Sequence, residues 1–189
     1  KCRIGVDDMD QNIHLDNFIN EVSSAGCNTF IIHARKAWLK GLSPKDNREI
    51  PPLNYERVYE LKNRFPDLKF IINGGIKSLH ESSKHLQHVD GVMIGREAYE
   101  NPLLLAEVDS VIFLDKKIST SRSDILKSLI PYIVEELERG TKISHITRHL
   151  MGLFRGFNGA KNMRKYLISL NHAMNPIENF EFLLKEETI

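Results

Sequence analysis

The sequence predicts an α/β fold, namely the C-terminal half of a TIM (β/α)8 barrel followed by an all-helical domain. Two segments carry the barrel prediction: FIINGG at residues 70–75 and VMIGR at residues 92–96. Each is an apolar run that stops at glycine, and a helix-sized segment separates them, which is the rhythm of consecutive βα units. From residue 123 onward apolar residues recur at helical spacing instead. We therefore expect a barrel part over residues 1–114 and a helical domain over residues 115–189.

The barrel part divides into strand-then-helix units, with strands that are apolar on both sides, as a parallel sheet covered by helices requires. The helical part begins at Ser123, a residue type that caps helices, and its first helix is closed by Gly140. The expected strands are 3–6, 29–32, one ending at Asn73 and one ending at Arg96; the expected helices are 15–22, 55–65, 79–86, 123–140, 143–153, 160–170 and 177–184, and a long polar loop covers 35–54.

The composition is that of an ordinary globular domain, with 41% hydrophobic and 27% charged residues among 189. No apolar stretch approaches the roughly 18 residues of a membrane span, and no apolar leader is visible at the N-terminus. Cys2 and Cys27 are too few for a disulfide scaffold, which favours a reducing, cytoplasmic location. The chain starts within an expected strand and without Met, so we expect a fragment.

The net charge of +1 hides an uneven distribution of charge. Residues 141–177 contain no Asp or Glu, yet they include Lys161, Arg164 and Lys165. A charged run is usually a solvated surface, but one that lacks counter-charges over such a length points towards a polyanion.

A phosphate site is indicated where the last two strands end. Asn73-Gly74-Gly75 supplies bare backbone N–H groups, and Gly95-Arg96 adds a guanidinium. The carboxyl ends of neighbouring parallel strands meet at one edge, and in a barrel the last two strands are where a phosphate is held. His33 ends the preceding strand and therefore shares that edge. The alternatives are ordinary turn glycines and a structural histidine.

The loop after His33 mixes cations with the chain's single tryptophan, Trp38. Arg35, Lys45 and Arg48 suit the phosphate backbone of RNA, while an aromatic ring either stacks on a base or packs against the loop. Loop packing is the simpler interpretation of Trp38, and a solvated loop is the alternative for the cations.

Nothing in the chain has the pattern of a catalytic or metal-binding group. Cys27 leads into a buried strand, and Cys2 has no recognisable activating partner. No pair of carboxylates has a spacing that argues for acid–base work, and Asp7, Asp8 and Asp10 are read as a turn that caps the next helix. We expect no catalytic residue and no metal site in this chain.

Several segments together resemble the tRNA-dihydrouridine synthases, specifically the A subfamily. The first of them is long and unusual enough to identify the subfamily, and the resemblance covers essentially the whole chain. The segments are HARKAWLKGLSP at 33–44, NREIPPL at 47–53, INGGI at 72–76, HLQHVDGVMIGREAY at 85–99 and NP at 101–102.

The resemblance implies an FMN at the C-terminal mouth of the barrel, with NADPH as its reductant. Hydride then passes to C6 of a flipped-out uracil, at tRNA positions 20 and 20a by the subfamily match, and a cysteine protonates C5. It implies tRNA contacts from the helical domain and the loop, with Lys45, Arg48, Lys161 and Arg164 as the best candidates beside Arg35 and Lys165. It implies FMN contacts from Lys1, His33, Asn73, Gly74, Gly75, Gly95 and Arg96.

The chain departs from the family's pattern because the barrel's first half, with its catalytic cysteine, is not present. We expect the chain alone to be inactive, to require its N-terminal half, and to form a monomer when complete. Two alternatives stay open: an FMN-dependent barrel oxidoreductase of a small molecule, and a non-catalytic RNA-binding remnant.

Overall fold

The structure is a computed structural model of the chain, and it describes residues 1–10, 12–116, 120–156, 158–172, 175, 177–178 and 180. The chain divides into two compact units, Lys1–Gly95 and Arg96–Ile189. Each unit has its own hydrophobic core. Within the described part of the chain, every helix falls short of the length and apolar character that a bilayer-spanning helix requires.

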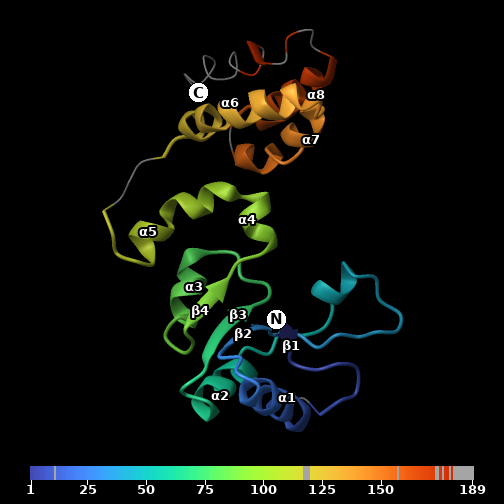
Figure 1. The fold of residues 1–189 in the computed structure, drawn as a ribbon, viewed down its shortest axis with the longest axis vertical. Coiled ribbons are helices and arrows are strands. Elements are labelled where there is room, and N and C mark those ends of the chain that lie inside the picture. Colours follow the sequence, from blue (N-terminus) through green and yellow to red (C-terminus); the bar gives the residue numbers. More distant parts are fainter. Residues whose placement is uncertain are drawn as a thin grey trace. The chain divides into compact units, whose positions relative to one another are not determined.

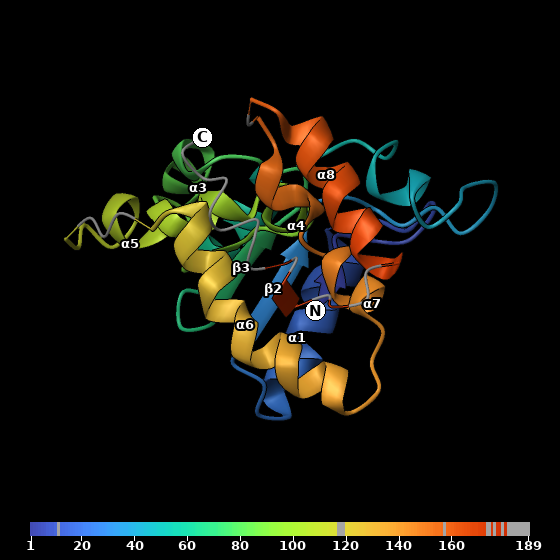
Figure 2. The same cartoon turned by 90° about the horizontal axis from the view of Figure 1, so that it is seen from above.

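The first unit is a parallel four-stranded sheet with the strand order β1-β2-β3-β4 and helices between successive strands (Figure 1). Figure 2 shows β2 and β3 running side by side. The sequential parallel order confirms the α/β prediction, and it is the order that consecutive strands of a barrel wall have. The elements are β1 Cys2–Arg3, α1 Ile13–Ser24, β2 Thr29–His33, α2 Glu56–Arg64, β3 Lys69–Asn73, α3 Leu79–His85 and β4 Gly91–Met93, with a 3-10 turn η1 at Asp46–Arg48.

The core of the first unit lies between the sheet and its helices. Alternate residues of β2 and β3 face this core, and register pairs Phe30 with Phe70 and Ile32 with Ile72. The two phenylalanine rings stack with their centroids 5.8 Å apart. Ile31 and Ile71, which have the opposite parity, are only half-buried. The strands are therefore apolar on both sides, as predicted, and the side that faces the helices is the more deeply buried.

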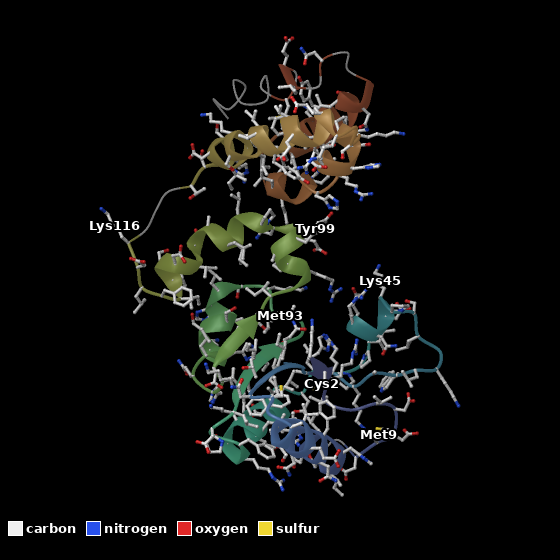
Figure 3. All side chains as sticks on the ribbon, in the orientation of Figure 1. Cys2, Met9, Lys45, Met93, Tyr99 and Lys116 are labelled. Carbon is white, nitrogen blue, oxygen red and sulfur yellow. The ribbon has the colours of Figure 1, made fainter. Side chains whose placement is uncertain are left out.

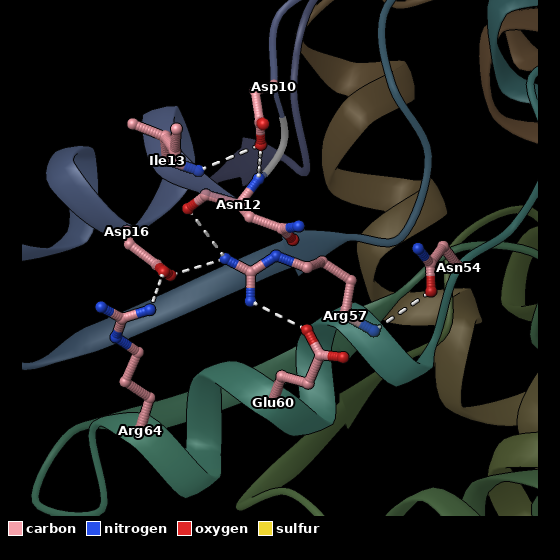
Figure 4. Close-up of polar contacts among 8 residues, drawn as sticks. All are labelled: Asp10, Asn12, Ile13, Asp16, Asn54, Arg57, Glu60 and Arg64. Atoms are coloured by element: carbon pink, nitrogen blue, oxygen red, sulfur yellow. Dashed lines mark hydrogen bonds and ion pairs between the residues drawn. The ribbon is translucent and has the colours of Figure 1, made fainter.

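A buried ion-pair cluster joins α1 to α2 (Figure 4). Asp16 of α1 accepts hydrogen bonds from Arg57 and Arg64 of α2, each at 2.5 Å. The Arg57 side chain is 4% exposed and that of Asp16 is 7% exposed, so both charges lie in the core. Arg57 also donates to the carbonyl of Asn12, at the start of α1. The cluster thus fixes the packing of the two helices that cover β1–β3.

The second unit is helical in its described residues. Its core gathers around Leu126 and Ile133 of α6, Phe154 of η3 and Leu167 of α8. The elements are α4 Arg96–Glu100, η2 Pro102–Glu107, α5 Val108–Val111, α6 Arg122–Glu138, α7 Ile143–Thr147, η3 Met151–Phe154, α8 Ala160–Ser169 and η4 Leu170–His172.

The units separate after Gly95, earlier than the boundary expected after residue 114. The reason is packing within the second unit. Glu97 of α4 accepts a hydrogen bond of 2.9 Å from Arg155. Gly152 of η3 approaches α4 so closely that a Cβ there would lie 2.3 Å from the carbonyl oxygen of Tyr99. Residues 96–107 therefore belong with the helices that follow them.

Two local predictions for the helical part differ from the structure. Ser121, not Ser123, caps α6, because Ser121 and Asp124 form a reciprocal capping box. The helix expected over 143–153 is split into α7 and η3, and Gly140 closes α6 as expected, with a φ of +85°. Most of the helix expected over 177–184 lies outside the described residues.

Candidate functional site

The carboxyl ends of the strands form one row of paired residues. Register places Arg3 of β1 beside His33 of β2, His33 beside Asn73 of β3, and Asn73 beside Met93 of β4. The expectation that His33 and Asn73 share an edge of the sheet is confirmed. We call these four residues the rim row. Lys1 immediately precedes β1 and is exposed.

Asn73 holds three strand ends together. Its side-chain Nδ2 donates to the carbonyl oxygen of Met93 at 2.8 Å, and its own carbonyl accepts from the N–H of Ala34 at 2.8 Å. Asn73 is 8% exposed, so these hydrogen bonds lie in a protected environment. The residue therefore has a structural task at the rim, and that Nδ2 can offer only its second hydrogen to a ligand.

The loop after β3 requires glycine at two successive positions. Gly74 and Gly75 have φ values of +121° and +72°, in the region that favours glycine. A Cβ on Gly75 would lie 2.8 Å from Leu53 Cδ1, and one on Gly74 would lie 3.1 Å from Leu53 Cδ2. Among the described residues, none accepts a hydrogen bond from the backbone N–H of Gly75 or Ile76. The loop thus has donors available for an anion, and its binding of a phosphate stays a prediction.

The second half of the expected phosphate site begins where β4 ends. Gly95 is exposed, and a Cβ there would meet no atom within 4 Å. Arg96 is exposed and is the first residue of α4, so it belongs to the second unit while Gly95 ends the first. The pairing of its guanidinium with the Gly74–Gly75 loop stays a prediction.

Guanidinium groups gather around Arg3 of the rim row. The Arg3 side chain donates to the carbonyl oxygens of Lys36, at 2.8 Å, and Asn47, at 2.7 Å. Burial lowers the pKa of Arg3, and the charges of Arg35 and Arg48 lower it further. Those two residues were predicted to share an RNA-facing loop, and the structure brings them near Arg3.

Arg3 was not among the site residues predicted from the sequence. Its position in the expected strand that precedes the strand of His33, at the same edge of the sheet, could have indicated it. Arg35 donates to the Pro51 carbonyl, and Lys45 stands exposed at the start of η1 (Figure 3). Positive charge therefore gathers along the loop that follows β2, as expected.

The cations predicted on the helical part share one face of α8. Lys161, Arg164 and Lys165 follow helical spacing, whereas Met163 and Leu167 of the same helix are buried. Arg155, which also lies within residues 141–177, the stretch without Asp or Glu, is instead paired with Glu97. The stretch is thus only partly lacking in counter-charge, because one acid comes from a distant part of the sequence.

Both cysteines pack against the core of the first unit. Burial raises the pKa of the Cys2 thiol. Cys2 pairs in register with Ile32, so it lies on the sheet face opposite the rim row. Among the described residues, no group of three His, Cys, Asp or Glu side chains could hold a metal ion.

Comparison with known proteins agrees with these features. The family model described as Dihydrouridine synthase (Dus) matches residues 1–188. Similar curated relatives include the tRNA-dihydrouridine(20/20a) synthases of Escherichia coli K12, 57% identical over 173 residues, Shewanella oneidensis, 54% identical over 172, and Vibrio cholerae, 53% identical over 173. Each alignment covers 91% of this chain and 50%, 51% and 53% of the respective relative.

The chain therefore spans about half the length of the curated relatives it matches. The family model, in contrast, extends over nearly all of its residues, including both the strand-end glycines and the helices of the second unit. The chain belongs to the dihydrouridine synthase family.

Proposed function

We propose that the complete protein containing this chain is an FMN-dependent tRNA-dihydrouridine synthase that uses NADPH to reduce D-loop uridines. The proposed targets are positions 20 and 20a, because the similar relatives are named tRNA-dihydrouridine(20/20a) synthases. The observation that carries the proposal is the rim row together with the glycine loop beside it. It supplies backbone donors where a phosphate-binding barrel needs them.

The residues at the rim fit an FMN phosphate. The N–H groups of Gly75 and Ile76 are donors without an acceptor among the described residues, and Gly74 and Gly75 hold the left-handed backbone that exposes them. In the proposal these groups, with Gly95 and Arg96, hold the phosphate, while Lys1, His33 and Asn73 contact the rest of the cofactor. When bound, FMN would supply hydride-transfer chemistry.

The RNA surface in the proposal has two parts, the loop after β2 and the cationic face of α8. Their cations neutralise tRNA phosphates, and a target uridine leaves its stack to reach the rim. The residues are Arg35, Lys45, Arg48, Lys161, Arg164 and Lys165. In the proposal, residues 1–114 bind the cofactor and contribute the loop after β2 to the RNA surface, and the helical residues 115–189 bind RNA.

The proposal also requires the other half of the barrel. β1 and β4 are the two outer strands of the sheet, so each has an edge without a neighbour in the described sheet. Strands of the remaining half would pair with these edges and close the barrel. The cysteine that protonates uracil C5 would come from that half, because Cys2 and Cys27 pack into the core.

The test uses the complete protein. A purified preparation should contain FMN, consume NADPH in the presence of tRNA that lacks dihydrouridine, and form dihydrouridine detectable by mass spectrometry of the digested tRNA. FMN without tRNA binding would favour a small-molecule oxidoreductase, and tRNA binding without FMN would favour a non-catalytic RNA-binding protein. Either outcome contradicts the proposal.

A further inference from the structure

Hydrogen bonds form a frame that fixes the backbone on both sides of Trp38. The segment after β1 and the segment after β2 are joined by backbone hydrogen bonds, from the Asp7 N–H to the Ala37 carbonyl at 2.7 Å and from the Ala37 N–H to the Gly5 carbonyl at 2.9 Å. The Leu39 N–H donates to Asp7 Oδ1 at 2.8 Å. Both neighbours of Trp38 are therefore fixed to the same short segment.

Asn47 fixes the backbone of Trp38 itself. Its Nδ2 donates to the Trp38 carbonyl at 2.6 Å, and its Oδ1 accepts from the Trp38 N–H at 2.8 Å. Arg3 of the rim row donates to the Asn47 carbonyl, so the frame is connected to the candidate cofactor edge. Asp7 adopts a φ of +43°, a conformation that costs a non-glycine residue roughly 1 kcal/mol or more.

This frame holds an aromatic ring that is not packed away. Trp38 as a whole residue is 36% exposed, although its backbone N–H and carbonyl are both hydrogen-bonded to Asn47. Simple loop packing, the interpretation favoured by the sequence, would bury the ring more fully, because apolar area removed from water is stabilising. A fixed backbone with an exposed ring is what a stacking surface requires.

Trp38 lines a cavity of about 340 Å³ that is open to the surface, together with Asp7, Asp8 and Lys40. The lining residues carry one aromatic side chain, two carboxylates and one ammonium group. The carboxylates accept hydrogen bonds from N–H groups and repel a bare phosphate, whereas Lys40 attracts one. A nucleotide combines all the matching parts, since it has an aromatic base with N–H donors and an attached phosphate.

We propose that the cavity bordered by Trp38 binds one unpaired nucleobase of the RNA substrate, a base that is not itself reduced. The base stacks on the Trp38 ring, its N–H groups face Asp8, and its phosphate lies near Lys40. This inference rests on the proposed function, because it takes tRNA as the substrate. It assigns to the Trp38 cavity a role in holding the RNA while a uridine reaches the rim.

The test measures tRNA binding by the complete, FMN-containing protein. Stacking of a base on an aromatic side chain contributes enough that Trp38→Ala should raise the Kd for tRNA between about 5-fold and 150-fold. Trp38→Phe keeps an aromatic face and should recover most of the affinity. Leu39→Ala is the matched control, because Leu39 is 69% exposed and does not line the cavity, and its Kd should match that of the wild type.

Two further measurements separate stacking from a structural role. Trp38→Ala should leave the salt dependence of binding unchanged, because it removes no phosphate contact, whereas Lys40→Gln should lower the slope of log K against log salt by about 0.7–0.9. tRNA should quench the tryptophan emission of the wild type more than that of Trp38→Phe, and this difference isolates Trp38.

The outcomes are distinguishable. If the wild type forms dihydrouridine and Trp38→Ala binds tRNA as tightly as it does, this inference is wrong while the proposed function stands. Equal weakening by Trp38→Ala and Trp38→Phe, without a quenching difference, would also overturn it. A wild type that binds no tRNA overturns both.

Discussion

The Tyr55 hydroxyl donates a hydrogen bond of 2.7 Å to the carbonyl of Gly74, and this contact ties the start of α2 to the loop after β3. The Tyr55 ring also meets the ring of His85 edge-on, with centroids 4.5 Å apart. The Tyr59 hydroxyl lies 2.7 Å from His85 Nδ1. Tyr55 is thus the residue of this group that supports the backbone of the Gly74–Gly75 loop directly.

Tyr55→Phe should weaken FMN binding without removing it. The change deletes one neutral hydrogen bond, and such bonds contribute about 0.5–1.5 kcal/mol, so we expect the Kd for FMN to rise about two- to tenfold. Titration of the flavin-free complete protein, followed by flavin fluorescence, measures this. Tyr59→Phe is the control, because Tyr59 contacts His85 rather than the loop. Equal FMN affinity of Tyr55→Phe and the wild type would contradict a supporting role for this contact.

The same residue gives a dependence of stability on pH. Burial, with a contribution from the Glu81 charge, raises the pKa of Tyr55 from 10.0 to about 12. Folding therefore favours the protonated hydroxyl, and its stabilising effect is fully present below pH 10 and is lost as pH rises through 12. The free energy of unfolding of the wild type, measured with urea, should fall more steeply with pH across this range than that of Tyr55→Phe. Parallel curves would contradict the shift.

Gly75→Ala should destabilise the protein. The alanine would have to adopt a φ of +72°, and its Cβ would lie 2.8 Å from Leu53 Cδ1, so we expect a loss of about 1–3 kcal/mol in the free energy of unfolding. Gly95→Ala is the control for stability, because a Cβ there has open space, and its effect should stay within about 0.5 kcal/mol. Urea titration of both variants measures the two losses of stability. Equal unfolding midpoints would show that the loop tolerates a side chain at residue 75.

In the ion-pair cluster between α1 and α2, removal of Asp16 should cost much more stability than removal of Arg64. Asp16→Ala deprives the Arg57 guanidinium, 4% exposed, of its nearest carboxylate, which should cost about 3–5 kcal/mol of stability. Arg64→Ala removes a partner that is 63% exposed and should cost about 0–1 kcal/mol. Chemical unfolding of the two variants measures both values. Similar losses would mean that Asp16 does not act through burial of Arg57.

Ser121→Ala should destabilise α6 by about 1 kcal/mol, because the Ser121 hydroxyl accepts a hydrogen bond from the Asp124 N–H at 3.1 Å. Ser123→Ala, which removes a serine from the first turn of the same helix, should change stability by less than about 0.5 kcal/mol. Thermal unfolding followed by circular dichroism compares the two. A larger effect at Ser123 would return the cap to the position that the sequence pattern favoured.

Local pattern was enough to predict the sheet, because β2 and β3 are continuous apolar runs that end at polar or glycine residues. The shared edge of His33 and Asn73 followed from the geometry of parallel strands alone. What the sequence could not reveal depends on contacts between distant segments. The pairing of Glu97 with Arg155, 58 residues apart, moves the division between the units, and no local pattern signals it.

The position of Arg3 illustrates the same point at the candidate site. Its role in holding the loop depends on hydrogen bonds to the carbonyls of Lys36 and Asn47, which are 33 and 44 residues away. Backbone carbonyls exist at every position, so the sequence does not mark these two as acceptors. The sequence likewise did not reveal that Trp38 is exposed, because a tryptophan that packs against a loop and one that stacks on a base are the same residue type.

The cationic face of α8 leads to a prediction about salt. Lys161→Ala combined with Arg164→Ala should weaken tRNA binding and reduce the slope of log K against log salt by about 1.4–1.8, as expected for two lost phosphate contacts. Arg139→Gln is the matched control, because Arg139 is held by Glu135 at 2.5 Å and Glu136 at 3.0 Å and so has little charge to offer RNA. Filter binding of tRNA over a series of salt concentrations gives each slope. If the double variant keeps the wild-type slope, the face formed by Lys161, Arg164 and Lys165 does not contact RNA.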